Sequence, residues 1–247
     1  MSRNRTLIGV GKGGAPLICV TRRPRISPGP LSSQKGSTLV TIKRRLAESA
    51  RVEAFSDGVF AVAITLLVLE LHAPEGKGEF LSELLAQWQT YVAYLAAFLV
   101  IGVVWMTHHS LFTRIGRVNS RLIAQNLLQL LLASLVPFAA GVVSDSQRMG
   151  ERSDQVVAVA LFALISIALS LSWYWLSWYV EKTPELLIDP SEIPALGRSR
   201  RAQLFTIFPP IAAFMLAFLS PLLALAILGV LPLFYLGSIL RTERGIE

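Results

Sequence analysis

The chain has 247 residues, of which 53% are hydrophobic and only 16% are charged, and its mean hydropathy is +0.56. A soluble domain would carry about 25% charged residues, so the composition excludes an ordinary soluble core. The apolar residues form long stretches without charge, which indicates helices rather than the short alternating strands of a membrane barrel. We therefore predict an all-α membrane protein.

Residues 1–45 form a basic segment in which Lys and Arg are separated by Gly, Pro and Ser. Its apolar runs, 7–10 and 15–20, are too short for the apolar region of a signal peptide. We predict a basic, disordered N-terminal arm; a solvated tail and an arm that binds anionic lipid are the two interpretations. The single cysteine, Cys19, lies in this arm, which excludes an intrachain disulfide and a cysteine-based metal site.

The remainder of the chain is predicted to cross the membrane six times. A spanning helix needs about 20 apolar residues, with about 17 tolerated. The last charge-free stretch, 202–240, is too long for one span and is divided by Ser220 and Pro221. The predicted spans are about 55–71, 90–107, 122–143 and 156–179, with two more in 202–240. The six-helix transmembrane domain is thus 46–240, followed by a short C-terminal tail, 241–247.

The distribution of positive charge supports this topology. If the N-terminus is cytoplasmic, 20 of the 23 Lys and Arg residues fall in cytoplasmic segments. We therefore predict a multi-pass protein of the cell membrane with both termini in the cytoplasm and the 72–88 loop outside. The same distribution explains the net charge of +7 without a nucleic-acid partner.

Five aromatic residues lie together at the predicted cytoplasmic end of the fourth span: Trp173, Tyr174, Trp175, Trp178 and Tyr179. Trp and Tyr are enriched where lipid headgroups meet the hydrocarbon core. The cluster therefore favours a headgroup-level belt over the alternative, an aromatic cage for a ligand.

The first span has two chemically different faces. At about 100° per residue, one face carries Phe55, Gly58, Val62, Thr65, Leu66 and Leu69. Asp57 falls near the opposite side, with Phe60 and Ile64, so it is expected to face neighbouring helices. The Val62, Leu66 and Leu69 stripe is consistent with ordinary helix packing and with the lining of a pore.

Polar side chains from three predicted helices meet at one depth on the cytoplasmic side. Ionisable groups near lipid are costly unless paired, which favours a shared hydrogen-bond network over solvated histidines. Asp57 would find its partners near His108 or Asn126. The residues that we assign to this structural network are Arg51, Phe55, Ser56, Asp57, Trp105, His108, His109 and Asn126, with Gln125 beside them.

These segments resemble a known family. The R-x-x-x-F-S-D start at 51–57, with Thr65 eight residues after the aspartate, is similar to the transmembrane protein 175 family of lysosomal and prokaryotic potassium channels. The W-x-x-H-H-x-L-F stretch at 105–112 and the N-L-L-x-L-L stretch at 126–131 also resemble it. The likeness covers about 46–240. Because one Phe-Ser-Asp segment is present, the resemblance implies the single-repeat form, which is a homotetramer.

The resemblance also implies how the ion passes. In this family the first helix of each subunit lines a central pore, without the Thr-Val-Gly-Tyr-Gly filter, which is also missing here. By distance from the aspartate, Val62, Leu66 and Leu69 would form the apolar constriction, and Thr65 would occupy the position linked to potassium preference. Val62 departs from the larger residue usual there, which either widens the narrowest layer or moves it to Leu66 or Leu69.

The expected function is that of a potassium-selective cation channel. Its expected partners are membrane lipids and the permeant K⁺ ion, and we expect no cofactor and no bound metal. We find no enzyme motif in the sequence. In particular, His108 and His109 are adjacent, whereas the two histidines of a zinc-binding helix are four residues apart. The alternative is a proton- or cation-coupled transporter, for which buried Asp and His would suit a proton relay and Pro209 and Pro210 would break a helix. A passive membrane scaffold is the third possibility.

Overall fold

The computed structural model describes residues 31–73 and 80–244, and the side chains of 48–73, 80–147, 150–230 and 232–233. The chain divides into two compact units, Met1–Leu39 and Val40–Glu247. Most of the predicted basic arm, 1–30, lies outside the described residues. Helix α1 begins at Leu31, directly after Pro30, so its backbone extends into the segment predicted to be a disordered arm. The stretch after Pro30 contains no further proline until the helix ends, which permits this extension.

The described part of the chain is helical throughout, with a single isolated bridge between Ile115 and Leu187. Four of its helices are long and apolar enough to cross a membrane: Glu48–Glu70, Trp88–Phe112, Ser120–Gln147 and Arg152–Lys182. The elements in chain order are α1 (Leu31–Leu66), η1 (Leu67–Glu70), α2 (Phe80–Ala86), α3 (Trp88–Phe112), α4 (Ser120–Met149), α5 (Arg152–Lys182), η2 (Pro184–Leu186), η3 (Pro190–Glu192), α6 (Ile193–Ala217) and α7 (Pro221–Arg244). The protein is therefore a helical membrane protein, as predicted.

Local sequence signals explain where several of these helices begin and end. Asn119 caps α4, because its side-chain oxygen accepts a hydrogen bond from the backbone N–H of Leu122 at 2.8 Å. The same helix ends at Gly150, whose φ of 77° is a left-handed conformation that favours glycine. The charge-free stretch breaks between Ala217 and Pro221, at the place predicted from the sequence. Short helix α2 lies in the segment that we expected to be only a loop.

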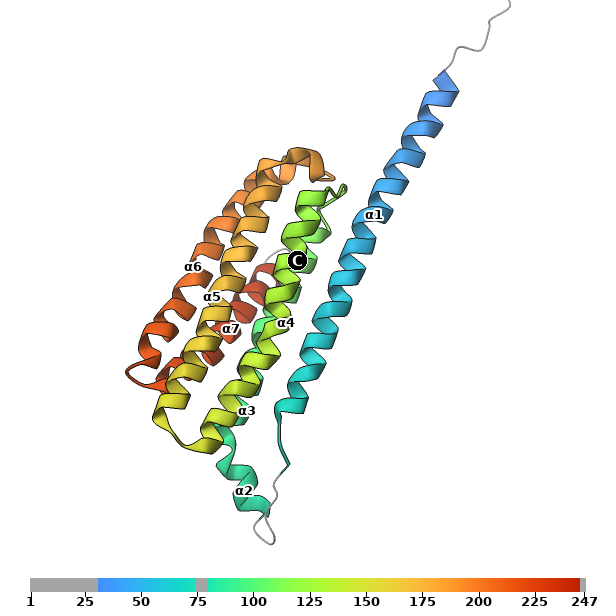
Figure 1. The fold of residues 1–247 in the computed structure, drawn as a ribbon. Coiled ribbons are helices and arrows are strands. Elements are labelled where there is room, and N and C mark those ends of the chain that lie inside the picture. The colour runs from blue at the N-terminus through green and yellow to red at the C-terminus, as the bar shows by residue number, and fades with distance from the viewer. Residues whose placement is uncertain (1–30, 74–79, 245–247) are drawn as a thin grey trace, which may run out of the picture. The chain divides into compact units, whose positions relative to one another are not determined.

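Five helices pack as a closed ring in the order α3, α4, α5, α6 and α7, with α7 returning to α3 (Figure 1). Buried side chains from all five fill the centre of this ring, among them Ile101, Val136, Phe162, Ala213 and Leu225. Segment η1, which follows α1, packs against α3 and α4. The second half of α1 therefore joins the bundle from outside the ring.

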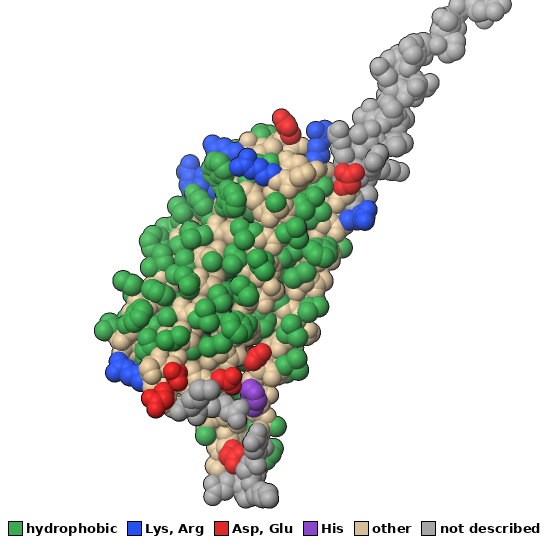
Figure 2. Space-filling view, viewed as in Figure 1, with side chains coloured by type: hydrophobic (Ala, Val, Ile, Leu, Met, Phe, Trp, Pro, Cys, Tyr) green, Lys and Arg blue, Asp and Glu red, His purple; other side chains and the backbone are tan. Residues whose placement is uncertain are grey.

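The surface separates into an apolar middle and two charged ends. Figure 2 shows a broad band of hydrophobic side chains, with Lys and Arg concentrated at one end and Asp, Glu and a histidine at the other. The basic end carries the 113–119 and 183–192 loops, which are joined by hydrogen bonds such as that from the backbone N–H of Gly116 to the carbonyl oxygen of Leu186 at 2.8 Å. This is the arrangement that the positive-inside rule describes for cytoplasmic loops.

The aromatic cluster of α5 is split between the surface and the interior. Trp175 and Trp178 are exposed, as a headgroup-level belt requires. Trp173 and Tyr179 are instead buried, with only 7% and 9% of their surface exposed. Five aromatic residues within two turns of a helix cannot all lie on its lipid-facing side, because the opposite side packs in the ring.

Candidate functional site

The second half of α1 has one face packed and one face exposed. Ser56, Phe60, Ala63 and Leu67 follow each other at helical spacing and are all at most 2% exposed. The other face carries the predicted stripe, in which Val62 is 58%, Leu66 is 43% and Leu69 is 69% exposed. A subunit by itself therefore leaves the apolar stripe without a partner, among the residues that the structure describes.

The remaining residues of the exposed face differ in chemistry. Thr65 is exposed, and its hydroxyl donates to the carbonyl oxygen of Val62 at 2.9 Å, which satisfies its one hydrogen and leaves its oxygen lone pairs facing outward. Phe55 is 57% exposed on the same side. Arg51, which we assigned to the polar network, is also exposed rather than buried with it.

The helix changes its geometry within the stripe. We expected an α-helix from 55 to 71, but α1 ends at Leu66 and continues as the 3₁₀ segment η1. Leu66 has φ −65° and ψ −26°, which are values typical of a 3₁₀ turn. The segment is held against α4, where the hydroxyl of Ser144 donates to the backbone carbonyl of Glu70 at 3.3 Å. A side-chain carbon at Gly141 would lie only 2.1 Å from Oε2 of Glu70, so a larger residue there would displace the carboxylate of Glu70.

A buried chain of hydrogen bonds connects α3, α4 and α1. The amide nitrogen of Asn126 donates to the Ser56 hydroxyl at 2.9 Å, and the Ser56 hydroxyl donates to the carbonyl oxygen of Val52 at 2.9 Å. Because the Asn126 amide oxygen can only accept, Nε2 of His108 donates to it at 2.8 Å. The three side chains are almost fully buried. We name Ser56, His108 and Asn126 the inner triad.

Aromatic rings enclose the histidine of the inner triad. Phe112 stacks on His108 with ring centroids 4.2 Å apart, and Phe60 meets it edge-on at 5.2 Å. These contacts, with the hydrogen bond to Asn126, fix the orientation of the imidazole. A buried, enclosed histidine differs from the solvated histidine that was the alternative for this position.

A second set of polar pairs lies nearer to the surface. Nε1 of Trp105 donates to Asp57 at 2.9 Å, and Nδ1 of His109 lies 2.9 Å from Oε1 of Glu53. The partner of Asp57 is therefore Trp105, a member of the predicted network that lies one helical turn from His108 on α3. The sequence analysis missed Glu53. Its signal was present, because Glu53 and Asp57 are four residues apart on α1, as are Trp105 and His109 on α3.

Two buried glutamines continue the polar layer toward α5. Gln129 accepts a hydrogen bond from the Ser172 hydroxyl, a contact that no spacing in the sequence indicated. Neither side-chain polar atom of Gln125 has a partner within the described residues. No group of three or more His, Cys, Asp or Glu that could hold a metal occurs in 31–73 or 80–244.

Known proteins are similar to this chain in sequence and in fold. The family model described as "Endosomal/lysosomal potassium channel TMEM175" matches residues 51–137, which include the exposed stripe and the inner triad. A protein named potassium channel from Streptomyces collinus is 40% identical over 191 residues, covering 76% of this chain and 91% of the relative. The chain belongs to the TMEM175 family. The family predicted from the sequence motifs is therefore confirmed.

Further comparisons show that this chain has the fold of the TMEM175 family. A potassium channel from Chamaesiphon minutus is 33% identical over 200 residues and is covered over 94% of its length. The crystal structure of a lysosomal potassium-selective channel TMEM175 homolog from Chamaesiphon minutus matches with a TM-score of 0.67 and 32% identity, covering 78% of this chain and 98% of that chain. Both relatives are matched over nearly their whole length.

Proposed function

We propose that this TMEM175 family member is a potassium-selective channel that conducts K⁺ passively, without a cofactor, through a pore lined by α1. The observation that carries the proposal is the exposed face of α1, where Val62, Leu66 and Leu69 are without a partner while the opposite face is fully packed. Relatives that this chain matches over most of their length are named potassium channels. The passive scaffold and the coupled transporter are the competing functions.

The packing of the subunit supports a pore between copies rather than within one. Large apolar side chains occupy the centre of the five-helix ring. An ion path through this centre would require their displacement from a closely packed core. The exposed face of α1, in contrast, is already available, and rings of apolar side chains can gate ions by excluding water.

Reconstitution tests the channel function directly. Purified full-length protein in liposomes should pass K⁺ down its gradient, at a reversal potential that follows K⁺ and does not shift with pH. Thr65→Val, which keeps the side-chain volume but removes the hydroxyl, should lower the preference for K⁺ over Na⁺, and flux should persist. A protein that gives no more flux than empty liposomes would contradict the channel, and a reversal potential that follows pH would favour the coupled transporter.

We further propose that the pore is completed by four copies of the chain. One helix with a narrow apolar stripe cannot enclose an ion path by itself, and homo-oligomers usually have closed cyclic symmetry. Native mass measurement in detergent should give four times the 27.1 kDa subunit mass. A monomer or dimer as the sole species that conducts after reconstitution would contradict the tetramer.

The proposed topology has six spans within 46–240, with both the basic arm and the 241–247 tail on the cytoplasmic side of the cell membrane. Helices α6 and α7 supply the fifth and sixth spans, and the basic end seen in Figure 2 lies in the cytoplasm. In a cysteine-free background (Cys19→Ala), Ala73→Cys should react with an impermeant maleimide in intact cells. Ile188→Cys, which is also exposed, should react only after permeabilisation. The reverse pattern would overturn the orientation.

A further inference from the structure

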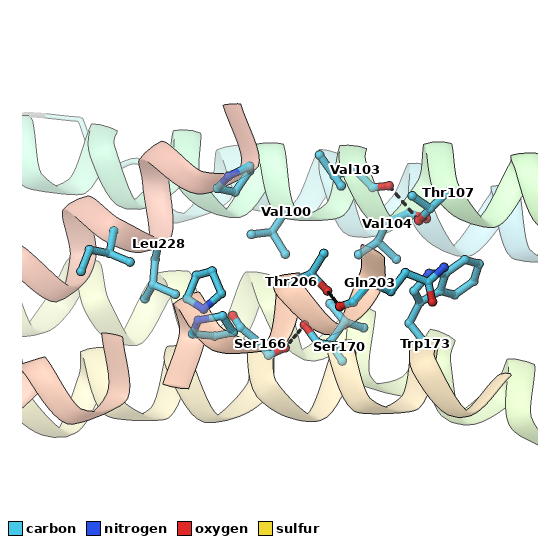
Figure 3. Close-up of a pocket in the computed structure, with 15 residues that line it drawn as sticks. Val100, Val103, Val104, Thr107, Ser166, Ser170, Trp173, Gln203, Thr206 and Leu228 are labelled. Atoms are coloured by element: carbon cyan, nitrogen blue, oxygen red, sulfur yellow. Dashed lines mark hydrogen bonds between the residues drawn. The ribbon is translucent and has the colours of Figure 1, made fainter. Parts of the chain in front are cut away.

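A cavity of about 130 Å³, partly open to the surface, lies between α3, α5, α6 and α7 beside the packed centre of the ring, and the proposed pore does not use it (Figure 3). Most of its wall consists of Val, Leu, Ile and Pro side chains. An apolar cavity of about 150 Å³ in another protein is large enough to hold benzene. The cavity therefore has room for a small molecule of that size.

One end of the cavity carries polar atoms without partners. Nε1 of Trp173 and the side-chain oxygen of Gln203 are buried and make no hydrogen bond to any described residue. Trp173 is more than nine-tenths buried and lines the cavity. Figure 3 shows Trp173 and Gln203 at the same end. A buried donor and a buried acceptor at one place are costly unless something pairs with them.

The other polar groups of the wall narrow the chemistry of the occupant. The hydroxyls of Thr107 and Thr206 donate to carbonyl oxygens of their own helices, at 2.9 Å to Val104 and 2.7 Å to Gln203, so they offer only acceptor lone pairs to the cavity. The indole N–H of Trp173 is a donor without a partner among the described residues, and the amide nitrogen of Gln203 is a second donor at this end. Among the side chains that the structure describes, none that lines the cavity is ionised, which disfavours a charged occupant.

Three prolines line the cavity, and each removes a backbone hydrogen bond from its helix. Pro209 and Pro210 lie within α6 and Pro232 within α7, and proline removes the helical hydrogen bond to the carbonyl four residues earlier. Two of those carbonyls belong to Thr206 and Leu228, which themselves line the cavity. Carbonyl oxygens freed in this way can accept a hydrogen bond, and the unpaired indole N–H of Trp173 fixes one position for an accepting group.

We infer that this cavity is a binding site for a small uncharged molecule that carries one hydroxyl group on an apolar body. A hydroxyl accepts from the indole N–H of Trp173 and donates to an acceptor such as the oxygen of Gln203. Its apolar part then occupies the space bounded by valine, leucine and proline. Water could occupy only the polar end, because a water molecule needs two to four polar partners and the rest of the wall is apolar.

Photolabelling tests the site without any measurement of ion flux. Purified full-length protein is irradiated with octanol that carries a diazirine on its chain, and adducts are mapped by mass spectrometry. We expect adducts on cavity residues such as Val104 and Leu169, with protection by excess plain octanol. Adducts confined to exposed residues such as Leu164 and Leu171, without protection, would overturn the inference.

Two matched substitutions locate the occupant. Val104→Phe fills the cavity and should abolish the protected adducts, whereas Val157→Phe makes the same change at a residue that is 66% exposed and should leave them unchanged. An unaltered elution volume and melting temperature establish that each variant is folded. Equal labelling of Val104→Phe and the wild type would place the octanol elsewhere and overturn the inference.

The hydroxyl requirement is tested separately. In the wild type, octanol should compete for the site more strongly than octane, by about fivefold, which is the size of one neutral hydrogen bond. Gln203→Met and Trp173→Phe should each reduce the preference for octanol over octane, while octane should still compete. If one of the two variants does not fold, the other is enough to test the hydrogen bond. Equal competition by octanol and octane in the wild type would show an apolar cavity without the proposed recognition.

Discussion

Replacing Leu66 by alanine is expected to raise K⁺ flux by about tenfold or more, which corresponds to lowering the barrier by about 1.4 kcal/mol. Leu66 belongs to the exposed stripe of α1, and in four copies its side chains would close the pore. An apolar ring opposes an ion because it removes water and supplies no replacement ligand. Alanine widens the ring and admits water, and Leu66→Asn adds an amide that can solvate the ion. The measurement is the initial rate of K⁺ flux in liposomes per assembled protein.

The control for this experiment is Leu164→Ala. Leu164 lies on α5 and is 53% exposed, so it matches Leu66 in residue type and exposure but lies away from α1. Its flux should equal that of the wild type. Leu69→Ala should raise flux in the same direction as Leu66→Ala, with a loss of ion preference if Thr65 shifts. Wild-type flux in both stripe variants would remove Val62, Leu66 and Leu69 from the pore.

Replacing Asn126 by leucine is expected to destabilise the protein by about 1–3 kcal/mol for each buried group that loses its partner. Asn126 joins the other two members of the inner triad. The substitution leaves Nε2 of His108 unpaired and removes the donor to the Ser56 hydroxyl, which keeps its own bond to the carbonyl oxygen of Val52. The thermal unfolding midpoint in detergent should fall, and the yield of assembled protein should fall with it. Whatever assembles should keep the ion preference of the wild type, because the triad does not face the exposed stripe.

The adjacent residue provides a matched control. Gln125 is also buried on α4, but its side chain has no partner within the described residues. Gln125→Leu removes polar atoms that are already unpaired, so it should leave the midpoint unchanged or raise it. Equal losses in the two variants would show that the hydrogen bonds of Asn126 do not set its contribution to stability.

The sequence was sufficient for the large features of this protein because those features follow from charge and length. Charge-free stretches marked the long helices, and Pro221 marked the break between the last two. The faces of α1 followed from its period, since the residues expected opposite the stripe, such as Phe60, are the buried ones. The family followed from the Arg51 to Asp57 motif.

The individual partners could not be predicted, because they depend on how helices rotate against one another. Asp57 pairs with Trp105, and His109 with Glu53. The sequence analysis placed Asp57, Trp105 and His109 only at a common depth and missed Glu53. The burial of Trp173 was missed for the same reason, since composition describes a belt and not which side of α5 faces lipid. The pore roles of the stripe residues stay predictions until flux is measured.

The change from α-helix to 3₁₀ geometry after Leu66 would alter how the proposed constriction is spaced along the proposed pore. In a 3₁₀ turn the side chains three residues apart eclipse each other, so Leu69 lies in line with Leu66 rather than rotated around the axis. Three residues advance about 6 Å at this rise, compared with about 4.5 Å in an α-helix. In four copies, Leu66 and Leu69 would then form two rings on the same axis, separated by about 6 Å along the pore. A permeating ion would shed and regain its hydration twice, and the slower of the two crossings would set the current.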